Sequence, residues 1–178
     1  MLHLLFGCIT ILILVNFGIM FSLLFSSLGL LIGSIVSFLL KQGKHFPVID
    51  FFLEQAEREQ EKHFPGKGAI TLFIGKILTH IIFFDNPTIV LGALIVLVFG
   101  DFTSTLAGKL FGKYKLIGKR TLEGSSAGFI VSFIYLSLIF EIPIAFLTAM
   151  IGMLAEFIPF EDNITIPLIS GLVLSLLL

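Results

Sequence analysis

Residues 86–140 read NPTIVLGALIVLVFGDFTSTLAGKLFGKYKLIGKRTLEGSSAGFIVSFIYLSLIF, with two apolar runs separated by a basic loop. Each run is close to the length of about 20 apolar residues that a helix needs to cross a bilayer. Asp101 lies near the end of the first run, and Glu123 begins the second. Ionisable side chains at membrane depth cost about 2.5–3.5 kcal/mol on insertion scales, so they usually serve a function. We therefore expect two transmembrane helices here, with functional residues at the ends that meet the basic loop.

The composition of the whole chain favours an integral membrane protein. Its 178 residues are 57% hydrophobic and include 21 phenylalanines, and the mean hydropathy is +1.10. A soluble domain is about 45–50% apolar. The single cysteine, Cys8, excludes a disulfide framework. We predict an all-α, polytopic integral membrane protein with about seven transmembrane helices.

The apolar runs divide the chain into the expected spans. Residues 2–40 are about twice the length of one span, so we expect two helices with a break near residues 21–27. Asn86 is expected to cap the fourth span, with Pro87 at its first helical position. Residues 41–66 are polar and fit a short amphipathic helix on the membrane surface. The remaining five expected spans cover residues 68–84, 87–107, 124–140, 143–157 and 164–178.

The cationic residues indicate which face is cytoplasmic. Ten of the eleven Lys and Arg residues lie in two expected loops, between spans two and three and between spans four and five. By the positive-inside rule, both loops are cytoplasmic. We expect one membrane domain over residues 1–178, with two N-terminal spans (1–40), a cytoplasmic amphipathic segment (41–66) and a catalytic five-span core (67–178). Its expected location is the cell membrane, with the active site facing the cytoplasm.

Four polar segments fall at the cytoplasmic ends of these spans. They are PGKGAIT (65–71), GDFTSTLAGK (100–109), KRTLEGS (119–125) and AEFIPFEDNITIP (155–167). Carboxylates can hold Mg²⁺, while Lys and Arg neutralise phosphate oxygens. Glu123 and Asn163 are each expected at a helix start, where unpaired backbone N–H groups attract anions. This combination favours phosphoryl transfer, in which catalysis is mostly positioning and charge stabilisation.

Simpler explanations exist for the individual residues. Basic loops beside spans often serve topology alone, and either membrane acid could pair with a lysine of another helix. Residues 108–112 and 124–128 each form a GxxxG pattern, which more often indicates close helix packing than phosphate binding. Lys76 and His80 lie one turn apart in the third expected span. For them we expect a buried pair with an acid, or a side chain that extends to the membrane surface.

Two of the quoted segments resemble a known family. GDFTSTLAGKLFGKYKL (100–116) with KRTLEGSSAGF (119–129) resembles the signature of the CTP-dependent polyprenol and diacylglycerol kinases, which include dolichol kinase and phytol kinase. PGKGAITLFIG (65–75) and EDNITIPLISG (161–171) resemble two further blocks of its short prokaryotic dolichol-kinase-like members. The resemblance extends over about residues 58–174 and keeps the family's order. It implies a Mg²⁺-requiring lipid kinase that transfers the γ-phosphoryl group of CTP to a polyprenol or dolichol-type alcohol.

The resemblance also implies a set of site residues. Asp101 and Asp162 would hold Mg²⁺, and Glu123 would be a third metal ligand or the catalytic base. The family usually has Lys directly before the Ser/Thr of its EGS block, where Arg120 stands here behind Lys119, so either cation could contact phosphate. The expected partners are a membrane lipid alcohol, CTP and the bilayer, and no nucleic acid. The residues implied in binding the nucleotide are Lys67, Lys109, Lys119, Arg120, Gly124 and Asn163.

Other functions fit the same features. A CTP:phospholipid cytidylyltransferase uses similar residues but joins a lipid phosphate to the α phosphate of CTP. A small ion-coupled transporter also carries acids within its spans. A purely structural membrane subunit is a third possibility, although it would leave the four polar segments at one face unexplained. The sequence leaves the particular lipid alcohol and the oligomeric state open.

Overall fold

The computed structural model describes residues 2–42, 66–118 and 120–178, and the secondary structure of these residues is helical apart from one isolated β-bridge. This confirms the all-α prediction. The expected amphipathic helix falls almost entirely outside the described residues. The α-helices are α1 (Leu2–Phe17), α2 (Ile19–Lys41), α4 (Lys67–Ile82), α5 (Pro87–Ile95), α6 (Phe102–Phe111), α7 (Leu122–Ser137), α8 (Ile142–Leu154) and α9 (Asp162–Leu177). A π-helix, η2 (Val96–Asp101), joins α5 to α6, and a 3₁₀ turn, η3 (Ala155–Phe157), follows α8.

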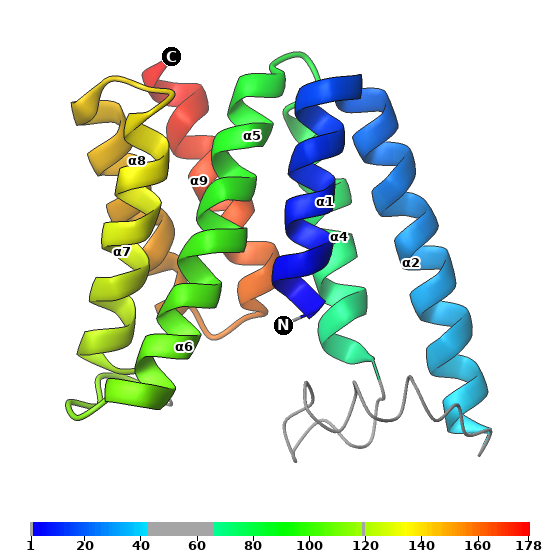
Figure 1. Ribbon diagram of the computed structural model, residues 1–178, viewed down its shortest axis with the longest axis horizontal. Helices are drawn as coiled ribbons and strands as arrows, with labels where there is room; N and C mark the ends of the chain where they lie inside the picture. Colours follow the sequence, from blue (N-terminus) through cyan, green and yellow to red (C-terminus); the bar gives the residue numbers. More distant parts are fainter. Residues whose placement is uncertain (1, 43–65, 119) are drawn as a thin grey trace.

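The helices run in alternating directions through the bundle, with α5, η2 and α6 forming one continuous stretch (Figure 1). The end of α2, the start of α4 and the α6–α7 and α8–α9 connections all face one end, which we call the charged end. The α4–α5 and α7–α8 turns lie at the opposite end, beside the C-terminus. The two expected basic loops therefore border the same end of the molecule, as the sequence predicts.

Two of the described helical stretches are long and apolar enough to cross a bilayer. They are Ile19–Lys41, with 23 residues, and Pro87–Phe111, with 25 residues. The other apolar helices are shorter; α7 and α9, for example, have 16 residues each. Sixteen residues rise about 24 Å, less than the ~30 Å hydrocarbon core. The two long stretches support membrane association, and the seven-span arrangement stays a prediction.

The N-terminal hairpin turns at Gly18, so the expected break near residues 21–27 is wrong. Gly18 has φ +86°, a left-handed conformation that glycine adopts without the steric cost of a Cβ atom. Because the residues on both sides are apolar, hydrophobicity gave no signal for this turn. The early turn leaves α2 with its full 23 residues.

The start of α5 is confirmed, but the end of that helical stretch is not. The side chain of Asn86 accepts hydrogen bonds from the backbone N–H groups of Thr88 and Ile89 at 3.2 and 3.4 Å, and Pro87 is the first helical residue. The helix then continues to Phe111, past the expected end at residue 107. The longer path places the last turns of α6 beside α7. The π-helix ends at Asp101, and such wide turns are frequent at functional sites.

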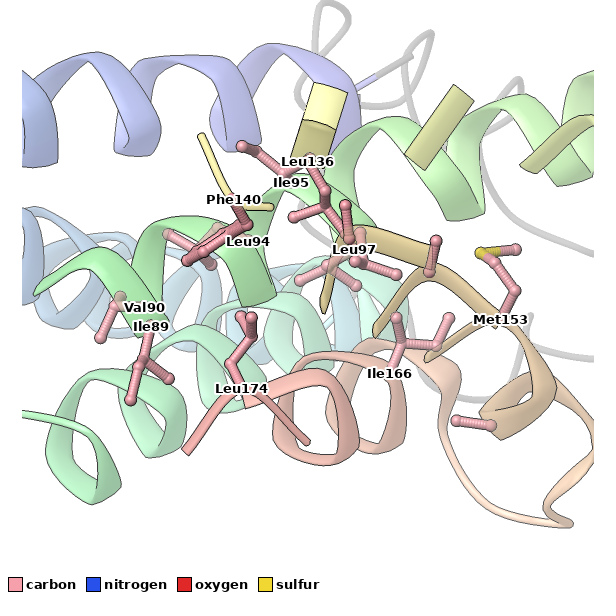
Figure 2. Packing of buried hydrophobic residues seen from close by; sticks show 14 of the residues in the cluster. Ile89, Val90, Leu94, Ile95, Leu97, Leu136, Phe140, Met153, Ile166 and Leu174 are labelled. Carbon is pink, nitrogen blue, oxygen red and sulfur yellow. The ribbon is translucent and has the colours of Figure 1, made fainter. Parts of the chain in front are cut away.

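The α5–η2 stretch forms the centre of the apolar core (Figure 2). Val90, Leu94 and Val96 are fully buried, and the core continues into Leu136 of α7 and Leu174 of α9. In the bundle these side chains hold η2 against α7, α8 and α9. Packing of this central helix therefore fixes the position of Asp101 at its end.

Glycines allow α6 and α7 to touch along the predicted GxxxG segments. A Cβ atom added to Gly124 would lie 2.6 Å from the Ser104 carbonyl oxygen and 3.1 Å from the Gly108 Cα atom. One added to Gly128 would lie 2.7 Å from the Gly100 carbonyl oxygen. Backbone at these distances leaves no room for a side chain, so the helix-packing explanation of the pattern is confirmed.

A buried polar network joins α1, α2 and α4, and it corrects the expectation for Lys76 and His80. Both side chains are fully buried. Lys76 Nζ donates to Thr10 Oγ1 at 2.8 Å and lies 4.2 Å from the centre of the Phe73 ring. His80 Nδ1 donates to the Lys76 carbonyl oxygen at 2.7 Å, and its Nε2 atom lies 2.8 Å from Ser22 Oγ. Among the described residues the ammonium thus contacts hydroxyl, carbonyl and aromatic groups, with neither an acid partner nor a path to the surface.

Candidate functional site

Arg120 brings together three carboxylates from distant parts of the sequence. Its Nη1 atom lies 3.9 Å from an Asp101 oxygen and 3.6 Å from a Glu156 oxygen. Its Nη2 atom donates to Asp162. Asp101 ends η2, Glu156 lies in η3 and Asp162 begins α9, so three separate elements meet at this guanidinium. We call these four residues the Arg120 cluster; it lies at the charged end of the bundle.

The backbone around Arg120 is fixed by short-range hydrogen bonds. The Leu116 N–H donates to the Arg120 carbonyl oxygen at 2.9 Å, which closes the connection between α6 and α7. Thr121 follows as the N-cap of α7, and its hydroxyl accepts from the Gly124 N–H at 3.2 Å. Because Gly124 is itself pressed against α6, the start of α7 has little freedom. Arg120 therefore enters the cluster from a constrained position.

The cluster combines partial burial with an excess of negative charge. The side chain of Arg120 is 15% exposed, that of Asp101 19%, that of Asp162 24% and that of Glu156 0%. Burial lowers the pKa of Arg120, but the charges of Glu156, Asp162 and Asp101 raise it more, so its pKa lies above the ordinary value. Among the described residues, one guanidinium faces three carboxylates. A group of acids of this kind suits a site that receives a cation.

Sequence analysis did not single out Glu156, although it lies in one of the four polar segments. Its Oε2 atom accepts from Ser104 Oγ at 3.1 Å and from Ser125 Oγ at 3.4 Å. Its Oε1 atom is buried and has no hydrogen-bond partner among the described residues. The usable signal was an acid directly after an apolar run, the same signal that drew attention to Asp101.

Two other predicted residues, Lys67 and Asn163, join the starts of α4 and α9. Lys67 forms an ion pair with Glu161. The Asn163 side-chain amide donates to Thr71 Oγ1 at 3.0 Å and to the Gly68 carbonyl oxygen at 3.3 Å. Asn163 thus holds α9 to α4 beside Asp162, and its role in binding the nucleotide stays a prediction.

Glu123 lies in the first turn of α7, as expected, but faces the preceding loop. Its carboxylate accepts from the Tyr114 N–H at 3.3 Å. Its pKa is lowered first by its own backbone N–H and further by the backbone and charge of Lys113, while desolvation opposes the shift. Among the described residues, the ion pairs of Arg120 are with Asp101, Glu156 and Asp162. Glu123 as a metal ligand or base stays a prediction.

The remaining predicted residues lie around the cluster in different ways. Lys109 is exposed in the last turn of α6. Gly124 is buried against α6, so its backbone serves helix packing. Lys119 lies outside the described residues. The choice between Lys119 and Arg120 as the phosphate contact therefore stays open, although Arg120 is the one described at the acids.

The donor set fits Mg²⁺ through two of the acids. In the described part of the chain, no three His, Cys, Asp or Glu side chains are arranged as a ready metal site. Mg²⁺ commonly binds through one or two carboxylates and completes its shell with water and phosphate oxygens. Asp101 and Asp162 are the two partly exposed carboxylates of the cluster, and both face Arg120. Binding of a metal ion between them would require the guanidinium to move away from this pair.

Comparison with known proteins identifies a family but does not indicate an activity. The chain is 31% identical over 156 residues to the uncharacterized protein MJ1137 of Methanocaldococcus jannaschii, over 83% of this chain and 76% of that protein. The chain belongs to the MJ1137 family. No protein-family model matches the chain, and no solved structure matches it. Membership of the MJ1137 family assigns no reaction, so the functional argument depends on the site.

Proposed function

We propose that this protein is a CTP-dependent lipid kinase that transfers the γ-phosphoryl group of CTP to a polyprenol or dolichol-type alcohol. The Arg120 cluster is the observation that carries the proposal. Asp101, Arg120 and Asp162 come from three of the four segments that resemble the kinase family, and both acids contact the Arg120 guanidinium. A structural ion pair would need one acid for one arginine. Three acids described around one arginine, two of them partly exposed, support a site for a metal ion and phosphates.

The membrane setting of the proposal rests on the exposed apolar surface. Along α2, the side chains of Phe21, Leu24, Leu28, Leu31 and Phe38 are each more than half exposed. Soluble monomers rarely expose an apolar face of this extent. Lipid contact would remove it from water. We propose seven spans in the cell membrane, with the shorter helices accommodated by local thinning of the bilayer, and the charged end in the cytoplasm.

The proposed mechanism assigns the exposed acids to the metal ion and the cations to phosphate. Asp101 and Asp162 would hold Mg²⁺, which would offset charge on the β and γ phosphates. Arg120, released from these two acids, would bind phosphate oxygens in its planar fork. Lys109, exposed nearby at the end of α6, would add a second positive charge. The polyprenol hydroxyl oxygen would bond to the γ phosphorus as the bond to CDP breaks, and a base would take the hydroxyl proton. Glu123 is the predicted base or a third metal ligand, and either role would require its carboxylate to leave the Tyr114 N–H.

The test offers the purified, membrane-reconstituted protein CTP labelled at either the α or the γ phosphate, with Mg²⁺ and a panel of lipid alcohols. A kinase moves only the γ label to lipid. Transfer of the α label to a phospholipid would replace the proposal by a cytidylyltransferase. Absence of transfer from either position, with no binding of CTP, would favour a transporter or a structural subunit.

A further inference from the structure

Glu156 differs from the other acids of the Arg120 cluster in its access to solvent. Its side chain is 0% exposed, whereas those of Asp101 and Asp162 are 19% and 24% exposed. A ligand that arrives from the charged end can therefore reach Asp101 and Asp162 but not Glu156. The three carboxylates divide into an exposed pair and a buried third. Only the exposed pair can change partners when a ligand binds.

Neutral donors from two helices hold Glu156 in place. Ser104 in α6 and Ser125 in α7 both donate to its Oε2 atom, which also lies 3.6 Å from Arg120 Nη1. Backbone contact at Gly124 fixes α6 against α7, so the two hydroxyls have a fixed separation. The other oxygen, Oε1, is buried and has no hydrogen-bond partner in the part of the chain that the structure describes. The carboxylate is thus anchored at one oxygen and has free hydrogen-bonding capacity at the other.

We propose that Glu156 is the positioning residue of Arg120. Glu156 keeps its ion pair with Arg120 when Asp101 and Asp162 leave the guanidinium to bind the metal ion of a nucleotide. The inference rests on the proposed function, because it requires a nucleotide at this cluster. A metal ion at the exposed pair takes away two of the three ion pairs described for Arg120, and Glu156 becomes its anchor. The free Oε1 atom then accepts a second guanidinium N–H, which gives a two-point contact. Such a contact fixes the direction in which the remaining N–H groups face phosphate.

A double-mutant cycle on CTP affinity tests whether Glu156 acts through Arg120. The full-length protein is compared with Glu156→Gln, Arg120→Gln and the double variant, and binding of CTP in excess Mg²⁺ is measured. Glu156→Gln is expected to weaken binding tenfold or more in the wild-type background and less than twofold beside Arg120→Gln. Equal weakening in both backgrounds, or none in the wild type, overturns the proposal. Glu141→Gln, the same change at an exposed residue of the opposite end, is the control and is expected to leave affinity unchanged.

Thermal unfolding of the same variants distinguishes this inference from the proposed function. If the wild type binds no CTP, the proposed function fails, but the coupling of Glu156 to Arg120 is still measured. Arg120→Gln leaves three acids without their cation, so adding Glu156→Gln is expected to raise the Tm. In the wild-type background the same change is expected to leave the Tm unchanged or lower. An equal Tm shift in both backgrounds overturns the pairing.

A second cycle applies if Arg120→Gln does not fold. Ser104→Ala with Ser125→Ala removes both neutral donors of Glu156 but keeps its charge. This double change is expected to weaken CTP binding at least threefold in the wild type, with no further effect once Glu156→Gln is present. The same loss in both backgrounds would show that the serines act independently of Glu156 and overturn the anchoring role.

Discussion

Replacement of Asp101 by Asn separates a metal-holding acid from a structural ion pair. At 3.9 Å from Arg120 Nη1, its attraction to the guanidinium is about 4 kcal/mol at an effective dielectric constant of about 20. Its repulsion from Glu156 and Asp162 offsets much of this, and both acids keep their contacts with Arg120. We therefore expect the free energy of unfolding to change by about 1 kcal/mol or less. Loss of a metal-holding acid should instead remove about 3 kcal/mol or more of transition-state stabilisation.

The expected result for Asp101→Asn is a folded, membrane-inserted protein with turnover reduced about 100-fold or more. Transfer of γ label from CTP to polyprenol measures the turnover, and thermal unfolding in the same detergent measures the stability. The matched control is Asp85→Asn, which makes the same change in the turn at the opposite end of the bundle. Near-normal turnover of Asp101→Asn would refute the reasoning and leave Asp101 as a structural partner of Arg120.

Three further predictions concern topology, the basic loop and helix packing. Reporters fused within the two basic loops should both read cytoplasmic, and one fused after residue 178 should read the opposite face; basic loops on different faces would exclude the proposed site. Lys109→Gln should weaken apparent CTP affinity or turnover tenfold or more, and Lys113→Gln threefold or less, because Lys109 lies on α6, which begins directly after Asp101, whereas Lys113 lies in the loop; kinetics with varied CTP give both values, and a flat response would leave the loop a topology signal. Gly75→Ala should destabilise the fold by about 2 kcal/mol or more, because its Cβ would overlap the Asn163 backbone, whereas Gly33→Ala, with only an ordinary contact at 4.0 Å, should be neutral or slightly stabilising in thermal unfolding; equal effects would contradict the close approach of α4 and α9.

Two features of the N-terminal half, the position of the first turn and the partners of Lys76, could not be predicted from the sequence. The turn at Gly18 lies within a mainly apolar run, where only Asn16 and the positive φ of one glycine mark it. The hydrogen-bond partners of Lys76 are about 70 residues away in the sequence, in α1. Because these partners are a hydroxyl and a backbone carbonyl on a facing helix, the sequence around Lys76 contains no pattern that predicts them. Local sequence therefore showed that Lys76 was unusual but not what it contacts.

The sequence by itself determined the helical class, the order of the helices and those boundaries that depend on neighbouring residues. Asn86 with Pro87 shows this, because a cap acts on N–H groups within three residues of itself. The tertiary structure alone decided which acids meet Arg120. Each helical residue turns about 100° from the one before, so small changes in helix rotation and depth determine whether a side chain faces a neighbour or solvent. Packing of η2, η3 and α9 brings Asp101, Glu156 and Asp162 to the guanidinium of Arg120. Glu123, which the sequence also indicated as a site acid, faces the loop before α7 instead.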